Sequence, residues 1–252
     1  MEQGNAILEN LYSLYSHVAE VSRNVSIITT DVFSIVHAQN SYWPNIVFSI
    51  DEKTYNEDTL EKMCKIISDN KLFPLVIATD NTNLTKLLRT KNFMPVEQWM
   101  GMIIELDTQK NEQTINNSYE MITYKKEDEI QQCIDIISEC LFNNNKLDGQ
   151  LFKSLLTHNR VELLAIRNES QTLGTTMIYY DENNLAGIYM VCTKPEHRGK
   201  GIGKILIKSA FKEICKRDIK TCVLHSTKQA LSLYQKTGFE KKAPINLYWK
   251  VK

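Results

Sequence analysis

The stretch Tyr189-Met-Val-Cys-Thr-Lys-Pro-Glu-His-Arg-Gly-Lys-Gly-Ile-Gly-Lys204 decides the fold of this chain. The residues that lead into it, Leu185 to Cys192, are largely apolar and predict a buried strand. Pro195 ends that strand because it has no N–H group to donate to a sheet. Apolar residues then recur at helical spacing, at Ile202, Ile205, Leu206, Ala210 and Ile214. The stretch therefore predicts a strand, a turn, a glycine-rich loop and a helix, in that order.

The glycine-rich loop has the composition of an anion site. The first N–H groups of a helix lack internal partners, and the helix dipole places partial positive charge there. Gly199, Gly201 and Gly203 leave room for a phosphate to approach this backbone, and three cations add full charges. The cations are Arg198, Lys200 and Lys204.

Two common phosphate loops do not fit these residues. A P-loop requires Ser or Thr after its Lys, but Ile205 follows Lys204. A dinucleotide fingerprint requires Gly at the position that Lys204 occupies. A tight turn without phosphate is the alternative, although one glycine would be enough for it.

The pattern Arg-Gly-x-Gly-x-Gly after such a strand resembles the acetyl-CoA-binding motif of the GNAT acyltransferases. The resemblance implies that the loop holds the pyrophosphate of acetyl-CoA. It also implies that the preceding strand bulges away from its neighbour, so that its free backbone groups bind the pantetheine amides and the thioester carbonyl. The implied cofactor-binding residues are Val191, Cys192, Thr193, Arg198, Gly199, Lys200, Gly201, Ile202, Gly203 and Lys204.

A second segment, Ala230-Leu-Ser-Leu-Tyr-Gln-Lys-Thr-Gly-Phe239, carries the same resemblance. Ala230, Leu233 and Tyr234 share one helix face, and Gly238 can adopt the left-handed conformation that ends a helix. In GNAT enzymes the matching Tyr is the general acid for the leaving thiolate, which implies that role for Tyr234. A core Tyr on an amphipathic helix is the alternative.

The chemistry implied by the resemblance is direct acyl transfer to an amine, which needs a base or a water relay. His225 ends the strand next to the predicted CoA strand, and its ordinary pKa of about 6.5 suits a base near neutrality. A hydrogen-bonded structural His is the alternative. Cys192 is disfavoured as a covalent nucleophile, because it has no evident base partner and the family transfers directly.

The order of the predicted elements indicates an α+β fold with a mixed central sheet. This order matches the GNAT fold over 119–252. We expect Asp58 to cap a helix and the last strand to break near Pro244. The polar, Asn-rich residues around 111–118 predict a linker between a first domain, 1–110, and an acetyl-CoA-binding catalytic GNAT domain, 119–252.

The first half contains an echo of the second at a constant offset of 146 residues. At that offset Leu88 replaces Tyr234, and Asn92, which tolerates left-handed geometry, replaces Gly238. No glycine loop precedes the predicted helix at 58–70. The first half therefore resembles a degenerate GNAT-like lobe, and chance similarity is the alternative.

Composition narrows the class of protein further. The net charge is zero, but 1–116 carries 9 basic and 15 acidic residues, and 117–252 carries 21 and 15, so a polyanionic ligand is expected on the second half. Basic residues do not alternate with aromatic residues, which disfavours nucleic acid as a ligand.

The six cysteines lack the spacing of a zinc site, so no metal is expected. They indicate a reducing compartment. No signal peptide and no membrane span are expected, which favours a cytoplasmic protein.

The leading hypothesis is an acetyl-CoA-dependent N-acetyltransferase that forms a ternary complex with an amine acceptor. An acyl-CoA-binding regulatory module without turnover and an interaction protein on an inactive GNAT scaffold are the alternatives. The acceptor is expected in a cleft between the lobes, lined by 30–50, 140–158 and the final strands, with Tyr42, Trp43, Tyr180 and Tyr189 as candidate lining residues. Small amines, peptides and protein lysines all stay open, as do a monomer and a homodimer.

Overall fold

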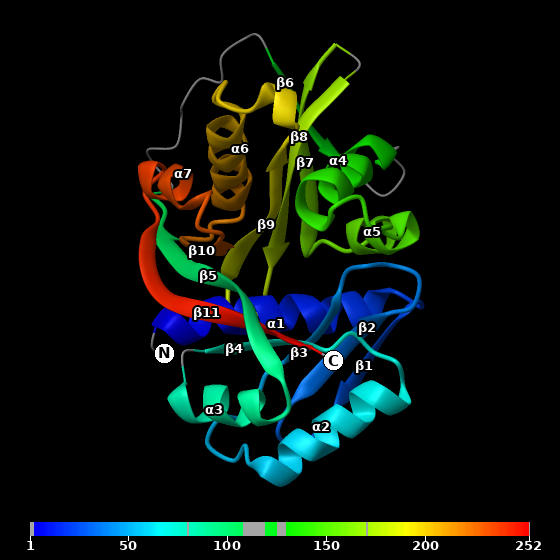
Figure 1. The fold of residues 1–252 in the computed structure, drawn as a ribbon. Coiled ribbons are helices and arrows are strands. Elements are labelled where there is room, and N and C mark those ends of the chain that lie inside the picture. Colours follow the sequence, from blue (N-terminus) through cyan, green and yellow to red (C-terminus); the bar gives the residue numbers. More distant parts are fainter. Residues whose placement is uncertain (1–2, 80, 108–118, 125–129, 170, 252) are drawn as a thin grey trace.

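The computed structural model describes 3–79, 81–107, 119–124, 130–169 and 171–251. These residues form an α+β fold built on one mixed sheet of 11 strands, in the order β1-β2-β3-β4-β11-β5-β10-β9-β8-β7-β6. Figure 1 shows α1 crossing the middle of the molecule. Helices α2 and α3 lie near the strands of the first half, and α4 to α7 lie around the strands of the second half. The predicted mixed central sheet is therefore confirmed.

The first half alternates helices and strands and ends on a long strand. Its elements are α1 (Gln3–Val21), β1 (Val25–Thr29), β2 (Ser34–Ala38), β3 (Asn45–Phe48), α2 (Glu57–Asp69), β4 (Leu75–Thr79), α3 (Thr82–Thr90) and β5 (Phe93–Glu105). The cap prediction for α2 is wrong: Asn56 is the N-cap, and its side chain accepts from the N–H of Thr59. An Asn side chain satisfies an unpaired first-turn N–H as well as an Asp does, so composition alone did not separate the two positions.

The second half carries the predicted order of elements. They are β6 (Glu120–Tyr124), α4 (Gln131–Phe142), α5 (Gly149–Leu156), β7 (Val161–Asn168), β8 (Gln171–Tyr180), β9 (Leu185–Thr193), α6 (Ile202–Lys216), β10 (Thr221–Ser226), α7 (Leu231–Lys236) and β11 (Glu240–Lys250). The predicted break at Pro244 is wrong, because β11 continues through it with a register shift between Lys241 and Ala243. That irregularity lets the strand accommodate a residue that cannot donate.

The two halves share their last strands. Strand β5, from the first half, lies between β10 and β11, and β11, from the second half, lies between β4 and β5. Consequently β4 pairs with β11 and β10 pairs with β5, both antiparallel. The sheet is continuous across the predicted domain boundary. The predicted linker lies outside the described residues, so the boundaries stay a prediction.

The echo in the sequence corresponds to a repeat in the structure. Strand β4 pairs in parallel with β3, as β10 pairs in parallel with β9. The helix that follows each strand ends at a residue with positive φ, Asn92 at 61° and Gly238 at 103°. An Asn at the first position tolerates this left-handed conformation. The first half therefore repeats part of the arrangement of the second, without the glycine loop and with Leu88 at the position that matches Tyr234.

Helix α1 anchors the first half to the second through a buried polar contact. The Asn10 side chain is fully buried, donates to Asp181 Oδ2 at 2.8 Å and accepts from the Tyr189 hydroxyl at 2.6 Å. Ser13 Oγ and the Tyr179 hydroxyl lie 2.8 Å apart in the same seam. A Cβ on Gly187 would lie 2.0 Å from Asn10 Oδ1, so only Gly fits there. The seam therefore fixes α1 against β8 and β9.

Replacing Asn10 with Ala is expected to lower the free energy of unfolding by about 3 kcal/mol, because two hydrogen bonds disappear and the buried Tyr189 hydroxyl loses its acceptor. Urea denaturation measures this. Ser16→Ala is the matched control, since Ser16 is an exposed α1 residue. It should change stability by less than about 0.5 kcal/mol. Equal effects of the two changes would contradict a stabilising seam.

Within the described part of the chain, no helix combines the length and the apolar character that crossing a membrane requires.

Candidate active site

Strand β9 separates from β10 after Gly187 and then bulges at Met190. The register between β8 and β9 shifts between Thr175 and Met177, and Met190 has a φ of 52°. Strands β9 and β10 both lie wholly within the described residues. They pair only where Leu185 to Gly187 of β9 lie beside Thr221 to Val223 of β10. Beyond that point a gap in the backbone ladder opens beside Val191 and Thr193, as the resemblance implied. The carbonyls of Tyr189 and Met190 instead accept from Thr176 and Thr175 of β8.

The glycine loop leaves β9 through a short 3₁₀ turn, Pro195–His197, and opens α6. Gly199 and Gly201 have φ values of 76° and 84°, and a Cβ on either would meet no atom within 4 Å. Gly201 is the N-cap of α6 and has no side chain to cap the first N–H groups. Glycine adopts this left-handed backbone without strain, and the absence of side chains leaves the space in front of the backbone open.

The cations of the loop point to solvent around this opening. Arg198, Lys200 and Lys204 are all exposed. Arg198 Nε donates to the Thr193 carbonyl at 3.2 Å, which holds the guanidinium beside the end of β9. Positive side chains and unpaired helix N–H groups therefore gather at one place, which suits a pyrophosphate. The residues present thus fit the phosphates of coenzyme A.

Two other loop positions have packing roles instead. Ile202 is 1% exposed and packs under the first turn of α6. A Cβ on Gly203 would lie 3.0 Å from Leu233 Cδ2, so Gly203 brings α7 close to α6. Both residues shape the site by placing these helices.

Tyr234 lies on α7 at the inner side of the site. Its side chain is 6% exposed, and its ring packs edge-on against Phe239 at a centroid distance of 5.9 Å. Burial raises the pKa of the Tyr234 hydroxyl, and the charge of a Cys192 thiolate would raise it further. Tyr234 therefore stays protonated at neutral pH, as a general acid must before it donates.

His225 lies at the end of β10 and packs against two aromatic rings. Its ring stacks on Trp99 at 5.2 Å and meets the edge of Tyr189 at 5.3 Å. Its Nδ1 is buried and has no hydrogen-bond partner among the described residues. Burial lowers the pKa of His225 to about 4. The imidazole is therefore neutral at pH 7, the form that can accept a proton.

The lowered pKa predicts a pH-dependent stability. Between pH 6.5 and about 4 the unfolded chain takes up a proton at His225 that the folded chain refuses, so stability falls as pH falls. His225→Gln has no such titrating group. Lowering the pH from 6.5 to about 4 should therefore reduce the free energy of unfolding of the wild type by roughly 3 kcal/mol more than that of the variant. Chemical denaturation at pH 7 and pH 4 measures it. A difference that does not change with pH would contradict the assignment.

The Cys192 side chain lies in the same core cluster as Tyr189. It is 6% exposed, and its Sγ lies 3.2 Å from Thr175 Oγ1. A hydrogen bond with Cys140 and burial raise the pKa of the Cys192 thiol well above its usual range. A buried thiol with a raised pKa is not activated for attack on a thioester, a weaker electrophile than a sulfenic acid.

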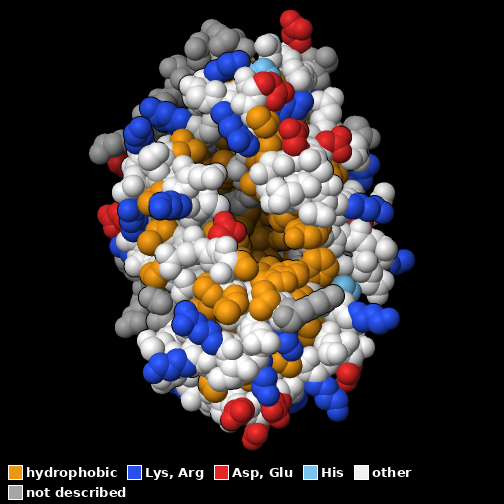
Figure 2. Space-filling model, viewed as in Figure 1, with side chains coloured by type: hydrophobic (Ala, Val, Ile, Leu, Met, Phe, Trp, Pro, Cys, Tyr) orange, Lys and Arg blue, Asp and Glu red, His pale blue; other side chains and the backbone are white. Residues whose placement is uncertain are grey.

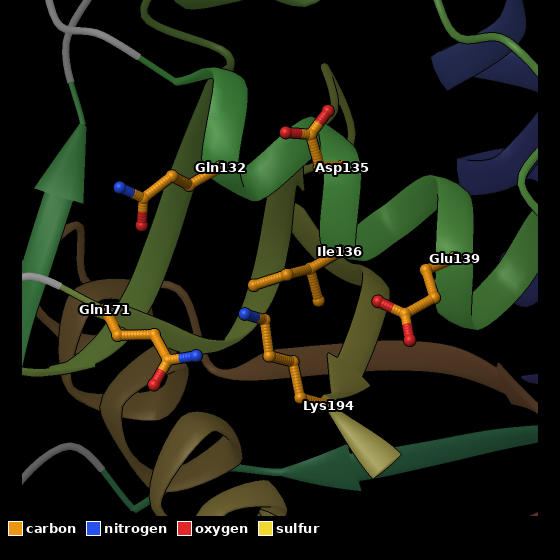
Figure 3. A pocket seen from close by; sticks show the side chains of 6 residues that line it. All are labelled: Gln132, Asp135, Ile136, Glu139, Gln171 and Lys194. Atoms are coloured by element: carbon orange, nitrogen blue, oxygen red, sulfur yellow. The ribbon is translucent and has the colours of Figure 1, made fainter. Parts of the chain in front are cut away.

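A polar pocket of about 370 Å³ lies beside the loop (Figure 3). Lys194 projects into it from the residue after β9, opposite Asp135 and Glu139 of α4. Gln132, Ile136 and Gln171 complete the lining. Two carboxylates against one ammonium disfavour a polyphosphate in this pocket.

Figure 2 shows a deep hollow near the centre of one face, with hydrophobic side chains along its walls. Rings from both halves of the chain meet in one set of contacts. Tyr42, 37% exposed, packs against Phe142 at 5.9 Å and Phe73 at 5.4 Å, and Trp43 packs against Phe152 at 5.8 Å. Tyr42 and Trp43 thus contact the segment that the sequence assigned to the acceptor cleft.

The other two candidate lining residues are core residues. Tyr180 donates to Glu162 Oε2 at 3.1 Å and lies under the Arg217 guanidinium. Tyr189 is buried and bonds to Asn10. Sequence reasoning missed Trp99, because a residue from the first half reaches the site only through the interleaved strand β5. It also missed the Met190 bulge, since no residue type there required it.

No group of three or more His, Cys, Asp or Glu side chains that could hold a metal ion occurs among the described residues.

Comparisons with known proteins agree with this geometry. Residues 122–246 match the family model described as an acetyltransferase (GNAT) domain. GCN5-related N-acetyltransferase 2, chloroplastic, from Arabidopsis thaliana is 31% identical over 74 residues. That alignment covers 29% of this chain and 29% of the plant protein, so the chain matches well under two thirds of its curated relative.

Solved structures match over nearly the whole chain. A GCN5-related N-acetyltransferase from Kribbella flavida superposes with a TM-score of 0.72 at 12% identity, covering 98% of this chain and 96% of that one. One from Sphaerobacter thermophilus gives a TM-score of 0.65 at 14% identity, covering 96% and 90%. A tandem GNAT protein from the clavulanic acid biosynthesis pathway gives 0.63 at 8% identity, covering 98% and 95%. These similarities show the fold of this chain. The match to the tandem GNAT protein supports a two-lobed arrangement.

Proposed function

Because this chain is a two-lobed member of the GNAT superfamily, with its acetyltransferase domain at residues 122–246, we propose that it is an N-acetyltransferase that moves an acetyl group from acetyl-CoA to an amine. The transfer is direct, in a ternary complex. The acceptor lies between the lobes, where Tyr42 and Trp43 contact rings of the second half.

The glycine loop carries this proposal. It combines two left-handed glycines with open space above them, three exposed cations and the unpaired N-terminus of the 15-residue helix α6. The loop follows directly on a bulged strand that has separated from its neighbour. A phosphate on the loop and an extended chain in the gap between β9 and β10 together match a long molecule with a phosphate head.

The remaining residues divide the proton chemistry between them. Backbone groups of Val191, Cys192 and Thr193 orient the thioester arm in the gap. His225, neutral because burial lowers its pKa to about 4, accepts a proton from the attacking amine directly or through water. Tyr234, which stays protonated because burial raises its pKa, donates to the leaving thiolate. Each group is in the protonation state that its step needs before the reaction starts.

Incubation with acetyl-CoA and a panel of amines tests the proposal. The panel contains aromatic monoamines, polyamines, amino acids and short peptides with a free N-terminus or lysine. We expect at least one amine to give CoA release and an acetylated product in equal amounts. Tight binding of acetyl-CoA with no product from any amine would favour the regulatory module without turnover.

A further inference from the structure

Two thiols meet where the last turn of α4 packs on the end of β9. Cys140 Sγ donates to the Thr193 carbonyl at 3.6 Å, and Cys192 Sγ lies 3.2 Å from Thr175 Oγ1. Each thiol also shifts the pKa of the other, as expected for two neighbouring sulfurs. The fold thus brings together two cysteines from distant elements, and all six cysteines of the chain are free.

The two thiols differ in access and in acidity. Cys140 is partly exposed, whereas Cys192 is 6% exposed. The hydrogen bond from Cys192 and the nearby Arg198 guanidinium lower the pKa of the Cys140 thiol to about 7, against the opposing effect of burial. The Cys140 thiol therefore ionises more readily than an ordinary cysteine, and the thiolate is the form that reacts.

Two other cysteines of the second half lack this combination. Cys133 and Cys222 are fully buried. Burial raises the pKa of Cys133 to about 12 and also raises that of Cys222. Neither offers an accessible thiolate, so an oxidant has less reason to react there than at Cys140.

We propose that Cys140 and Cys192 are an oxidation site that closes to a reversible disulfide when the protein meets a hydroperoxide. The Cys140 thiolate attacks one peroxide oxygen, the O–O bond breaks, and Cys140 becomes a sulfenic acid as hydroxide leaves. Cys192 then attacks the Cys140 sulfur, the S–O bond breaks, and the thiol proton and hydroxyl leave as water. In total two thiols and one hydrogen peroxide give one disulfide and two waters.

The geometry favours this second step over further oxidation. Cys192 needs no access to solvent, because the Cys140 sulfur lies against the carbonyl of Thr193, the residue next to Cys192. The bond would join the end of α4 to the end of β9, immediately before the glycine loop. It would also remove the thiol that donates to the Thr193 carbonyl. This inference concerns the thiols alone and does not depend on the proposed transferase activity.

Limited treatment of the full-length protein with hydrogen peroxide, followed by alkylation and mass spectrometry, tests the proposal. We expect the intact protein to lose the mass of two hydrogen atoms and two alkylatable thiols, and to regain both with dithiothreitol. Peptide mapping should identify the Cys140–Cys192 link, with fragmentation used to distinguish Cys140 from Cys133. Folded wild type in which Cys140 and Cys192 both remain alkylatable after treatment would overturn the proposal.

Three variants sharpen the test. Cys192→Ser should give no disulfide at Cys140 and let it gain two oxygens, because no thiol resolves its sulfenic acid. Cys140→Ser should leave Cys192 reduced. Cys64→Ser is the matched control, a partly exposed cysteine on helix α2, and should close the disulfide as wild type does. A link from Cys140 to Cys133 instead would also overturn the proposal, and the wild-type map alone decides this if a variant fails to fold.

Discussion

Gly201→Glu is expected to weaken acetyl-CoA binding by at least about 100-fold, a loss of roughly 3 kcal/mol. The carboxylate would occupy the open space in front of the first turn of α6, where the phosphates are proposed to lie. A negative charge there repels the phosphates. The non-glycine residue would also strain a backbone with φ of 84°. Calorimetric titration with acetyl-CoA measures the effect.

Gly201→Asn separates the two causes of this loss. Asn tolerates positive φ and carries no charge, so the helix N-terminus keeps its shape and its field. We expect this variant to bind acetyl-CoA within about tenfold of the wild type. If Gly201→Glu binds as the wild type does while staying folded, the phosphates do not lie on this loop.

Tyr234→Phe is expected to lower kcat by about 100-fold and to leave the KM for acetyl-CoA nearly unchanged, because it removes only the proton donor for the leaving thiolate. The ring and its packing against Phe239 remain. Initial rates with the best acceptor from the amine panel, measured at several pH values, check this. The wild-type rate should show no loss from Tyr234 ionisation near neutrality, since its pKa is raised.

Tyr180→Phe is the matched control. Tyr180 is also a buried tyrosine with a raised pKa, but its hydroxyl donates to Glu162 under Arg217. Its loss should change stability and leave kcat within about twofold. Equal losses of kcat in the two variants would indicate a general effect of removing a buried hydroxyl, and the acid role of Tyr234 would be wrong.

The elements near the loop could be predicted from sequence because each depended on local chemistry. Pro195 ended β9, the apolar spacing after Gly201 gave α6, and Gly238 ended the segment of Tyr234. The repeat at a constant offset likewise predicted that Asn92 would take positive φ, as Gly238 does. Such signals lie within a few residues of the feature that they determine.

The shared strands could not be predicted, because the choice of sheet neighbour depends on packing between distant segments. Nothing in the sequence of β5 indicates that it pairs with β10, and that pairing brings Trp99 onto His225. The contact between Cys140 and Cys192 has the same origin, since α4 packs on β9 only in the assembled fold. The Asn10 seam also required the fold, because its partners Asp181 and Tyr189 lie far along the chain.

Calorimetric titration of the wild-type protein with acetyl-CoA at moderate salt tests the central claim most directly. The account predicts a single site with micromolar affinity, weakened by added salt because three exposed cations and a helix N-terminus attract the phosphates. Desulfo-CoA, which keeps the phosphates and lacks the thiol, should compete for that site. No binding of acetyl-CoA by the folded protein would contradict the placement of the cofactor on the glycine loop and every catalytic role derived from it.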